Sequence, residues 1–258
     1  MNFFDSFFKI DNDRGKMNFS LEIGPHTDLE TLPPVKDVYV TMLPGGDYKE
    51  TAQKSGDLVK KGFNPVPHFP SRSISDEGQL KDYISICKDV GVKQALVIGG
   101  SRKPIGKFDS SIQILETGFF EGIKIGIAGH PEGSPDISDT ELEKAMVDKK
   151  PYADYIVTQW LLNSQPIIDY ISKQSVPVHV GITGPMKISS LIKFANIVGA
   201  KNSINFLKSN FSKALDLLKP KDPNELIGKV NEFTDNFHID TFGGLKETNK
   251  WLKENGYV

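Results

Sequence analysis

Eight short apolar runs, each followed by a stretch with helical spacing, are spread along this chain. Several runs are nearly continuous in Val, Ile and Leu, which indicates strands of a parallel sheet covered on both faces. Strand and helix alternating eight times predict an α/β fold, a closed (β/α)8 TIM barrel whose strand-end loops converge on one mouth. The predicted strands are residues 19–23, 38–42, 64–68, 94–98, 123–128, 155–158, 176–181 and 237–241.

The length of the chain fits one such barrel. Its 258 residues predict a single domain over residues 1–258, with residues 1–17 as an N-terminal extension. Pro65 and Pro67 count against the assignment of the third strand, because proline cannot donate to a sheet ladder. Helices are expected over residues 48–61, 75–90, 187–197, 203–218, 220–232 and 245–255.

Composition narrows the possible partners and the compartment. The formal net charge of −2 argues against a nucleic-acid-binding surface and favours a small-molecule partner. Cys87 is the only cysteine, which fits a reducing, cytoplasmic location. No apolar run approaches the roughly 18 residues that span a bilayer, so we expect no membrane partner. The apolar residues 3–8 are consistent with a homo-oligomer interface or with cover for the lower end of the barrel.

The chemically distinctive residues follow the predicted strands. In barrel enzymes these strand ends carry the reactive and binding groups. Two adjacent glycines would also let a flat ring or a pyrophosphate approach the backbone. The candidate residues at the strand ends are Thr41, His68, Gly99, Gly100, Ser101, Ala128, His130 and Gln159.

Glu22 lies inside the apolar first strand, where its carboxyl group would face the barrel interior or its rim. Burial without a partner disfavours the charged form, so this glutamate could keep its proton near neutral pH and act as a general acid. A structural salt bridge inside the barrel explains the position equally well.

Other barrel chemistries find less support. Strand six ends in Thr158 and Gln159, so it offers no lysine for a Schiff base. His238 and Asp240 share one face of the last strand, but two ligands without a third predict no metal site. The segment 241–244 could hold a phosphate at the next helix, which leaves a phosphate-binding lyase or isomerase as an alternative.

Three segments, taken in order, resemble the methylenetetrahydrofolate reductase family. They are Phe-Ser-Leu-Glu-Ile-Gly-Pro at 19–25, Ala-Gly-His-Pro-Glu-Gly-Ser-Pro at 128–135, and Ala-Asp-Tyr-Ile-Val-Thr-Gln at 153–159. The resemblance extends from about residue 19 to 245. It implies the catalytic barrel of a flavoprotein that binds FAD and uses NAD(P)H to reduce 5,10-methylenetetrahydrofolate to the 5-methyl form.

The resemblance also implies roles for individual residues. Glu22 matches the acid that helps to protonate the folate, and Gln159 matches a residue that contacts pterin and nicotinamide. Phe211 matches a phenylalanine that packs on the folate. The positions matching flavin contacts are Thr41, His68, Gly99, Gly100, Ser101, Ala128 and His130.

The loop after strand four departs from the family. The family has Leu-Arg-Gly-Asp there, whereas this chain has Ile98-Gly99-Gly100-Ser101 and lacks both charged side chains. Their loss should change cofactor affinity and the charge balance around the reacting ring. Two alternatives therefore stand beside the flavoprotein: a reductase in which NAD(P)H transfers hydride directly, and a folate-binding barrel without turnover.

Overall fold

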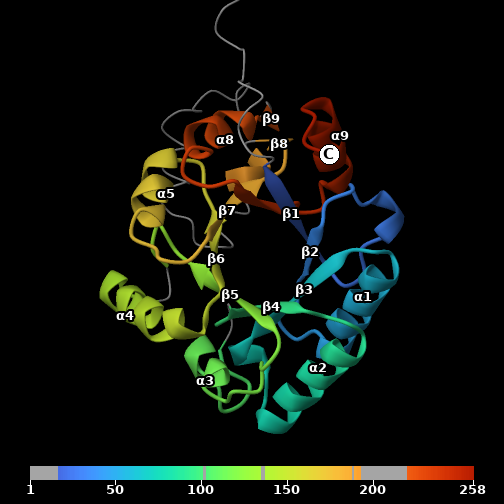
Figure 1. Ribbon diagram of the computed structural model, residues 1–258, viewed down its shortest axis with the longest axis vertical. Coiled ribbons are helices and arrows are strands. Elements are labelled where there is room, and N and C mark those ends of the chain that lie inside the picture. The colour runs from blue at the N-terminus through green and yellow to red at the C-terminus, as the bar shows by residue number, and fades with distance from the viewer. Residues whose placement is uncertain (1–16, 101–102, 135–136, 188, 193–219) are drawn as a thin grey trace, which may run out of the picture.

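The computed structural model describes residues 17–100, 103–134, 137–187, 189–192 and 220–258. Its parallel strands form a closed barrel in the order β1-β10-β7-β6-β5-β4-β3-β2, and helices surround them (Figure 1). The predicted single-domain (β/α)8 barrel is therefore confirmed as the fold. The barrel strands are β1 (Asn18–Ile23), β2 (Asp37–Val40), β3 (Asn64–Pro70), β4 (Gln94–Ile98), β5 (Lys124–Gly129), β6 (Tyr155–Trp160), β7 (Val178–Thr183) and β10 (Asn236–Asp240).

The described helices alternate with the barrel strands, and those at residues 48–60, 77–89 and 245–254 match predicted ranges, whereas no ranges were predicted for those at 111–115, 139–149 and 164–171. The helices are α1 (Tyr48–Lys60), α2 (Glu77–Asp89), α3 (Ser111–Leu115), α4 (Asp139–Lys149), α5 (Ser164–Ile171), α8 (Asn224–Val230) and α9 (Leu245–Glu254). Three short 3-10 helices, η1 (Leu29–Thr31), η2 (Ser71–Ser73) and η3 (Lys150–Tyr152), and a small pair of strands, β8 (Met186–Lys187) and β9 (Pro220–Lys221), complete the described elements. The predicted helix over 203–218, most of that over 187–197, and residues 1–16 of the extension lie outside the described residues.

Side chains alternate between two cores along the strands. On β1, Phe19, Leu21 and Ile23 are buried in the large core that includes the inner faces of the helices. A second cluster, which includes Tyr39 and Tyr155, fills the barrel interior. The intervening residues of β1, among them Glu22, belong to the interior face because neighbours on a strand point to opposite sides.

Capping side chains determine where helices begin. Asp76 accepts a hydrogen bond from the backbone N–H of Gln79 at 2.9 Å, so α2 begins at Glu77 rather than at the predicted residue 75. Ser138 and Glu141 form a reciprocal capping box at the start of α4. These caps satisfy N–H groups that have no partner within the helix.

The third strand is longer and better paired than its prolines suggested. β3 runs to Pro70, two residues beyond the prediction, and pairs with β2 and β4. Pro65 and Pro67 lie two residues apart, so both missing N–H groups fall on the same side of the strand. Val66 between them keeps its N–H group, so the two prolines do not prevent this strand from pairing with both neighbours.

Several other strand ends also differ from prediction. β6 and β7 end two residues later than expected, whereas β2 ends two residues earlier. Within the described part of the chain, none of the helices has the length and apolarity needed to cross a bilayer.

Candidate functional site

Glu22 is the centre of a polar cluster inside the barrel, near the carboxyl end of β1. Its side chain is 25% exposed, and its Oε2 lies 3.3 Å from His68 Nε2 of β3. The same oxygen lies 3.7 Å from His238 Nε2 of β10. Both imidazoles are almost fully buried, burial lowers the pKa of His68, and His68 Nε2 has no hydrogen-bond partner among the described residues.

Neighbouring side chains fix the orientation of His238. Ser20 Oγ, two residues before Glu22 on β1, lies 3.1 Å from His238 Nδ1. The ring of Tyr39 packs on the imidazole with centroids 4.2 Å apart. When Ser20 donates to Nδ1, the Nε2–H of His238 is directed at Glu22.

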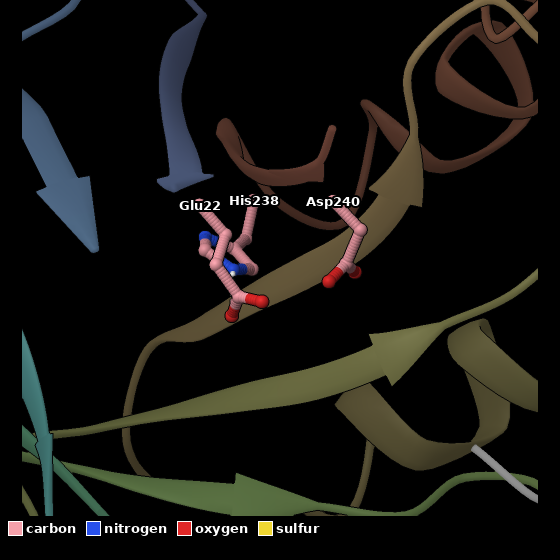
Figure 2. Close-up of side chains that lie close together, drawn as sticks. All are labelled: Glu22, His238 and Asp240. Carbon is pink, nitrogen blue, oxygen red and sulfur yellow. Dashed lines mark ion pairs between the residues drawn. The ribbon is translucent and has the colours of Figure 1, made fainter. Parts of the chain in front are cut away.

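Asp240 brings a second carboxyl group to the same place. In the register of β1 with β10, Glu22 lies directly opposite Asp240. Figure 2 shows the two carboxyl groups pointing into the same space, with His238 beside them. One ligand atom from each of Glu22, His238 and Asp240 lies within 4.8 Å of the other two.

The charges of the two carboxyl groups differ because their neighbours differ. Burial and the negative charge of Glu22 raise the pKa of Asp240 well above its ordinary value. Burial also acts to raise the pKa of Glu22, but His68 and His238 outweigh it, so this pKa is lowered. Of the two interpretations of Glu22, the ion pair inside the barrel therefore agrees better with the structure than a carboxyl group that burial without a partner keeps protonated.

From the sequence, only two possible metal ligands, His238 and Asp240, were expected together. The structure adds a third, Glu22, which comes from another strand. Glu22, His238 and Asp240 together offer the three protein ligands found in many catalytic zinc sites. The oxygen of Glu22 already faces two imidazoles, and one proton on Asp240 is enough to relieve the repulsion between the carboxyl groups. We assign no metal ion to these residues.

Gln159 lies near the carboxyl end of β6, at an irregularity in the sheet. The register between β6 and β7 shifts between Val157 and Trp160. Thr158 Oγ1 accepts a hydrogen bond from the Gly181 N–H at 2.8 Å and donates one to the Gln159 carbonyl at 2.9 Å. Such bulges redirect side chains near functional sites. The Oε1 of Gln159 is buried and has no hydrogen-bond partner among the described residues.

The positions expected to meet a flavin lie at the mouth, but several already have partners within the protein. Thr41 Oγ1 donates to the carbonyl of Ile23 at 3.3 Å. The carbonyl of Ala128 accepts from Lys149 Nζ at 3.3 Å. His68 faces Glu22, and His130 directly follows β5.

The glycine loop after β4 has open space on one side. An added Cβ at Gly99 would meet no atom within 4 Å. Gly100 has φ +88°, which a side chain would strain. Ser101 and Phe211, the other two predicted contacts, lie outside the described residues.

Two cations at the described part of the mouth already have partners within the protein. The diphosphate and the ring edge of FAD need cations or N–H donors. Arg72, a described cation beside the glycine loop, donates to the carbonyls of Asp109 and Gly100 at 2.8 and 3.2 Å. Lys149 is buried against Ala128, and burial lowers its pKa to about 8. These two cations do not supply the contacts that the resemblance implies for FAD, and we derive no step through it.

The sequence pattern placed His238 and Asp240 on one face of the last strand only as metal ligands to be set aside, and it did not indicate Tyr39. The first two alternate along one strand, a pattern that places both side chains in the barrel interior. Their meeting with Glu22 depends on the pairing of the first strand with the last, which no local pattern encodes.

The fold is shared with several solved structures, although no protein-family model matches the sequence. An uncharacterised protein from Clostridium thermocellum that binds two copies of 5-methyl-5,6,7,8-tetrahydrofolic acid has a TM-score of 0.60, at 14% identity over 95% of this chain and 96% of that chain. A candidate phosphonomutase from Burkholderia cenocepacia J2315 has a TM-score of 0.56, at 9% identity over 94% of each chain. Tryptophan synthase from M. tuberculosis has a TM-score of 0.53, at 10% identity over 93% of this chain and 91% of that chain. At these identities, the likeness establishes the barrel fold alone.

Proposed function

We propose that this protein binds a reduced folate in the barrel mouth and reduces 5,10-methylenetetrahydrofolate to 5-methyltetrahydrofolate with NAD(P)H. One observation carries the proposal: Glu22, held by two imidazoles, and the unpartnered amide oxygen of Gln159 lie near the carboxyl ends of the two strands that match the family's motifs. The similarity in fold to a protein that binds 5-methyltetrahydrofolic acid supports folate as the ligand class.

The proposed substrate carries N–H donors that could pair with Gln159 and a nitrogen that the cluster around Glu22 could protonate. A pterin presents N–H donors along one edge, and Gln159 Oε1 is a buried acceptor without a donor. Leaving such an acceptor unpaired costs roughly 1–3 kcal/mol, so a ligand that pairs with it gains affinity. The five-membered ring of the substrate opens only when a nitrogen is protonated, and the acidic cluster around Glu22 can provide that proton.

The proposal allows two routes for the hydride, through bound FAD or directly from NAD(P)H. The resemblance implies FAD, whereas the pairing of Arg72 and Lys149 within the protein favours direct transfer from NAD(P)H. The absorption spectrum of the purified protein, followed by titration with FAD, tests for a flavin. Steady-state kinetics test the route: parallel double-reciprocal lines support transfer through a bound carrier, and intersecting lines support direct transfer in a ternary complex.

A folate-binding protein without turnover is the second candidate. It is favoured by the loop at Gly99 and Gly100, which lacks the charged side chains that the family places beside the reacting ring. Full conversion of 5,10-methylenetetrahydrofolate with either nicotinamide nucleotide would exclude it.

Folate binding and reduction are tested separately with two variants. Gln159→Ala should weaken binding of 5-methyltetrahydrofolate by about tenfold in calorimetry, because one hydrogen bond is lost. Gln165→Ala, on the exposed face of α5, is the matched control and should bind like wild type. Glu22→Gln should reduce folate turnover by about 10²- to 10⁴-fold. Wild-type protein that shows no folate binding would refute the proposal.

A further inference from the structure

We propose that Glu22 and Asp240 hold one proton between them and that this carboxyl pair, rather than Glu22 alone, is the proton donor of the site. The inference rests on the proposed function for the identity of the proton acceptor. The pair itself is a property of the protein without ligand, so it can be tested independently.

The geometry of the barrel forces the two groups together. Glu22 and Asp240 are register partners on adjacent parallel strands, and both side chains belong to the interior face. Their carboxyl groups point into the same space (Figure 2), with one oxygen of each within the 4.8 Å limit of the cluster. Two partly buried carboxyl groups this close oppose each other's ionisation, because the charge of one raises the pKa of the other.

The surrounding groups decide where the proton resides. Imidazoles from β3 and β10, those of His68 and His238, face Glu22 and stabilise its charged form. Tyr39 of β2 packs on His238 and is neutral, because burial and nearby negative charges raise its pKa well above 10. On the β7 side, the register partner of Asp240 is Thr183, which does not ionise.

Among the described residues, Asp240 forms no ion pair, whereas Glu22 lies within ion-pair distance of two imidazoles. Burial and the charge of Glu22 raise the pKa of Asp240, so the shared proton resides mainly on Asp240. The resting pair carries one negative charge, placed mainly on Glu22.

The pair would act in one balanced step. The proton passes from the pair to N10 of 5,10-methylenetetrahydrofolate, and the bond between N10 and the methylene carbon breaks with its electrons remaining on N10. The methylene carbon becomes part of a cationic iminium with N5, and the pair becomes doubly negative. Its second charge then stabilises the iminium until hydride from the nicotinamide nucleotide reduces it, after which the pair regains a proton from solvent.

Infrared spectroscopy tests the pair without any ligand. A protonated carboxylic acid has a C=O stretch that a carboxylate lacks, and carbon-13 labelling of aspartate moves the band if the acid is Asp240. In chelator-treated wild-type protein we expect this band at pH 7, shifted by labelled aspartate and absent from Asp240→Asn. In Glu22→Gln the band should disappear at a lower pH than in wild type, because one cause of the raised pKa is gone.

The control is Asp235→Asn, which removes an exposed carboxyl group just before the same strand and should leave the band unchanged. A wild-type protein without the band at pH 7 overturns the proposal. A band that persists in Asp240→Asn and is lost in Glu22→Gln overturns the assignment of the proton to Asp240. The wild-type titration with labelled aspartate gives an answer even if a variant does not fold.

Turnover provides the second readout. At pH 7, Asp240→Asn should lose about 10²- to 10⁴-fold in folate reduction and should recover toward acidic pH, where Glu22 itself becomes protonated. A purely structural role for Asp240 would not produce that pH-dependent recovery. The infrared band without any folate turnover would refute the proposed function and leave the pair intact, whereas turnover without the band would refute the pair.

Discussion

His179 should make the barrel sensitive to acid. Its imidazole lies in the interior, stacked on Tyr155 with centroids 4.6 Å apart, and Lys124 lies 5.1 Å from the centre of the same tyrosine ring. Burial, with smaller contributions from the charges of His238 and Lys124, lowers the pKa of His179 from 6.5 to about 4. Below pH 6.5 His179 is therefore protonated in the unfolded chain but remains neutral in the folded chain until the pH approaches 4.

The size of the effect follows from linkage. At pH 7.5 neither state is protonated at His179 and the contribution to stability is negligible. At pH 5 the unfolded state is almost fully protonated and the native state hardly at all, which costs about 2 kcal/mol of unfolding free energy. The loss grows as the pH falls from 6.5 toward 4 and is constant below that.

The measurement compares urea unfolding of wild type and His179→Phe at pH 7.5 and pH 5. Phenylalanine keeps an aromatic ring against Tyr155 and removes the titration, and effects of the other titrating groups cancel in the comparison. We expect the stability difference between the two proteins to move by about 2 kcal/mol in favour of the variant at pH 5. A difference that does not change with pH would mean that His179 accepts its proton in the folded barrel, and the burial argument would fail.

Three further predictions concern packing and the β6 irregularity. Thr158→Val should cost about 1–3 kcal/mol in urea unfolding, because the N–H of Gly181 loses its acceptor, while Thr158→Ser should retain most of the stability. Gly126→Ala should cost about 1–3 kcal/mol by the same assay, because the new Cβ would lie 2.6 Å from ring carbons of Tyr155; wild-type stability would contradict the packing. Cys87 is buried and its pKa is raised to about 12, so a thiol reagent should label it only at the rate of unfolding, and rapid labelling of native protein would refute this.

The fold could be predicted from sequence because its signal is local. The fourth strand matches its predicted bounds, Gln94 to Ile98, because a continuous apolar run between polar segments leaves little freedom in where it begins and ends. The case against the third strand was local as well, because prolines at 65 and 67 weaken an isolated strand. In the barrel they are tolerated, because both missing N–H groups fall on one side of the strand.

The candidate site was predictable only in part. The position of Glu22 in an apolar strand marked it as unusual, and the structure places it beside the polar side chains of His68, His238 and Asp240. Its protonation could not be predicted, because that depends on imidazoles 46 and 216 positions away in the sequence, His68 and His238. The role of Asp240 depends on strand register, which a single sequence does not contain.

The pairing of β1 with β10 makes the site a product of barrel closure. Glu22 and Asp240 belong to the first and the last strand, so they become neighbours only when the two ends of the sheet join. Contacts between residues this distant in sequence carry the largest loop-closure cost and commonly form late in folding. In a barrel that has not closed, Glu22 and Asp240 would therefore be two separate acids with ordinary properties. The proposed proton donor would form only when the first and last strands pair.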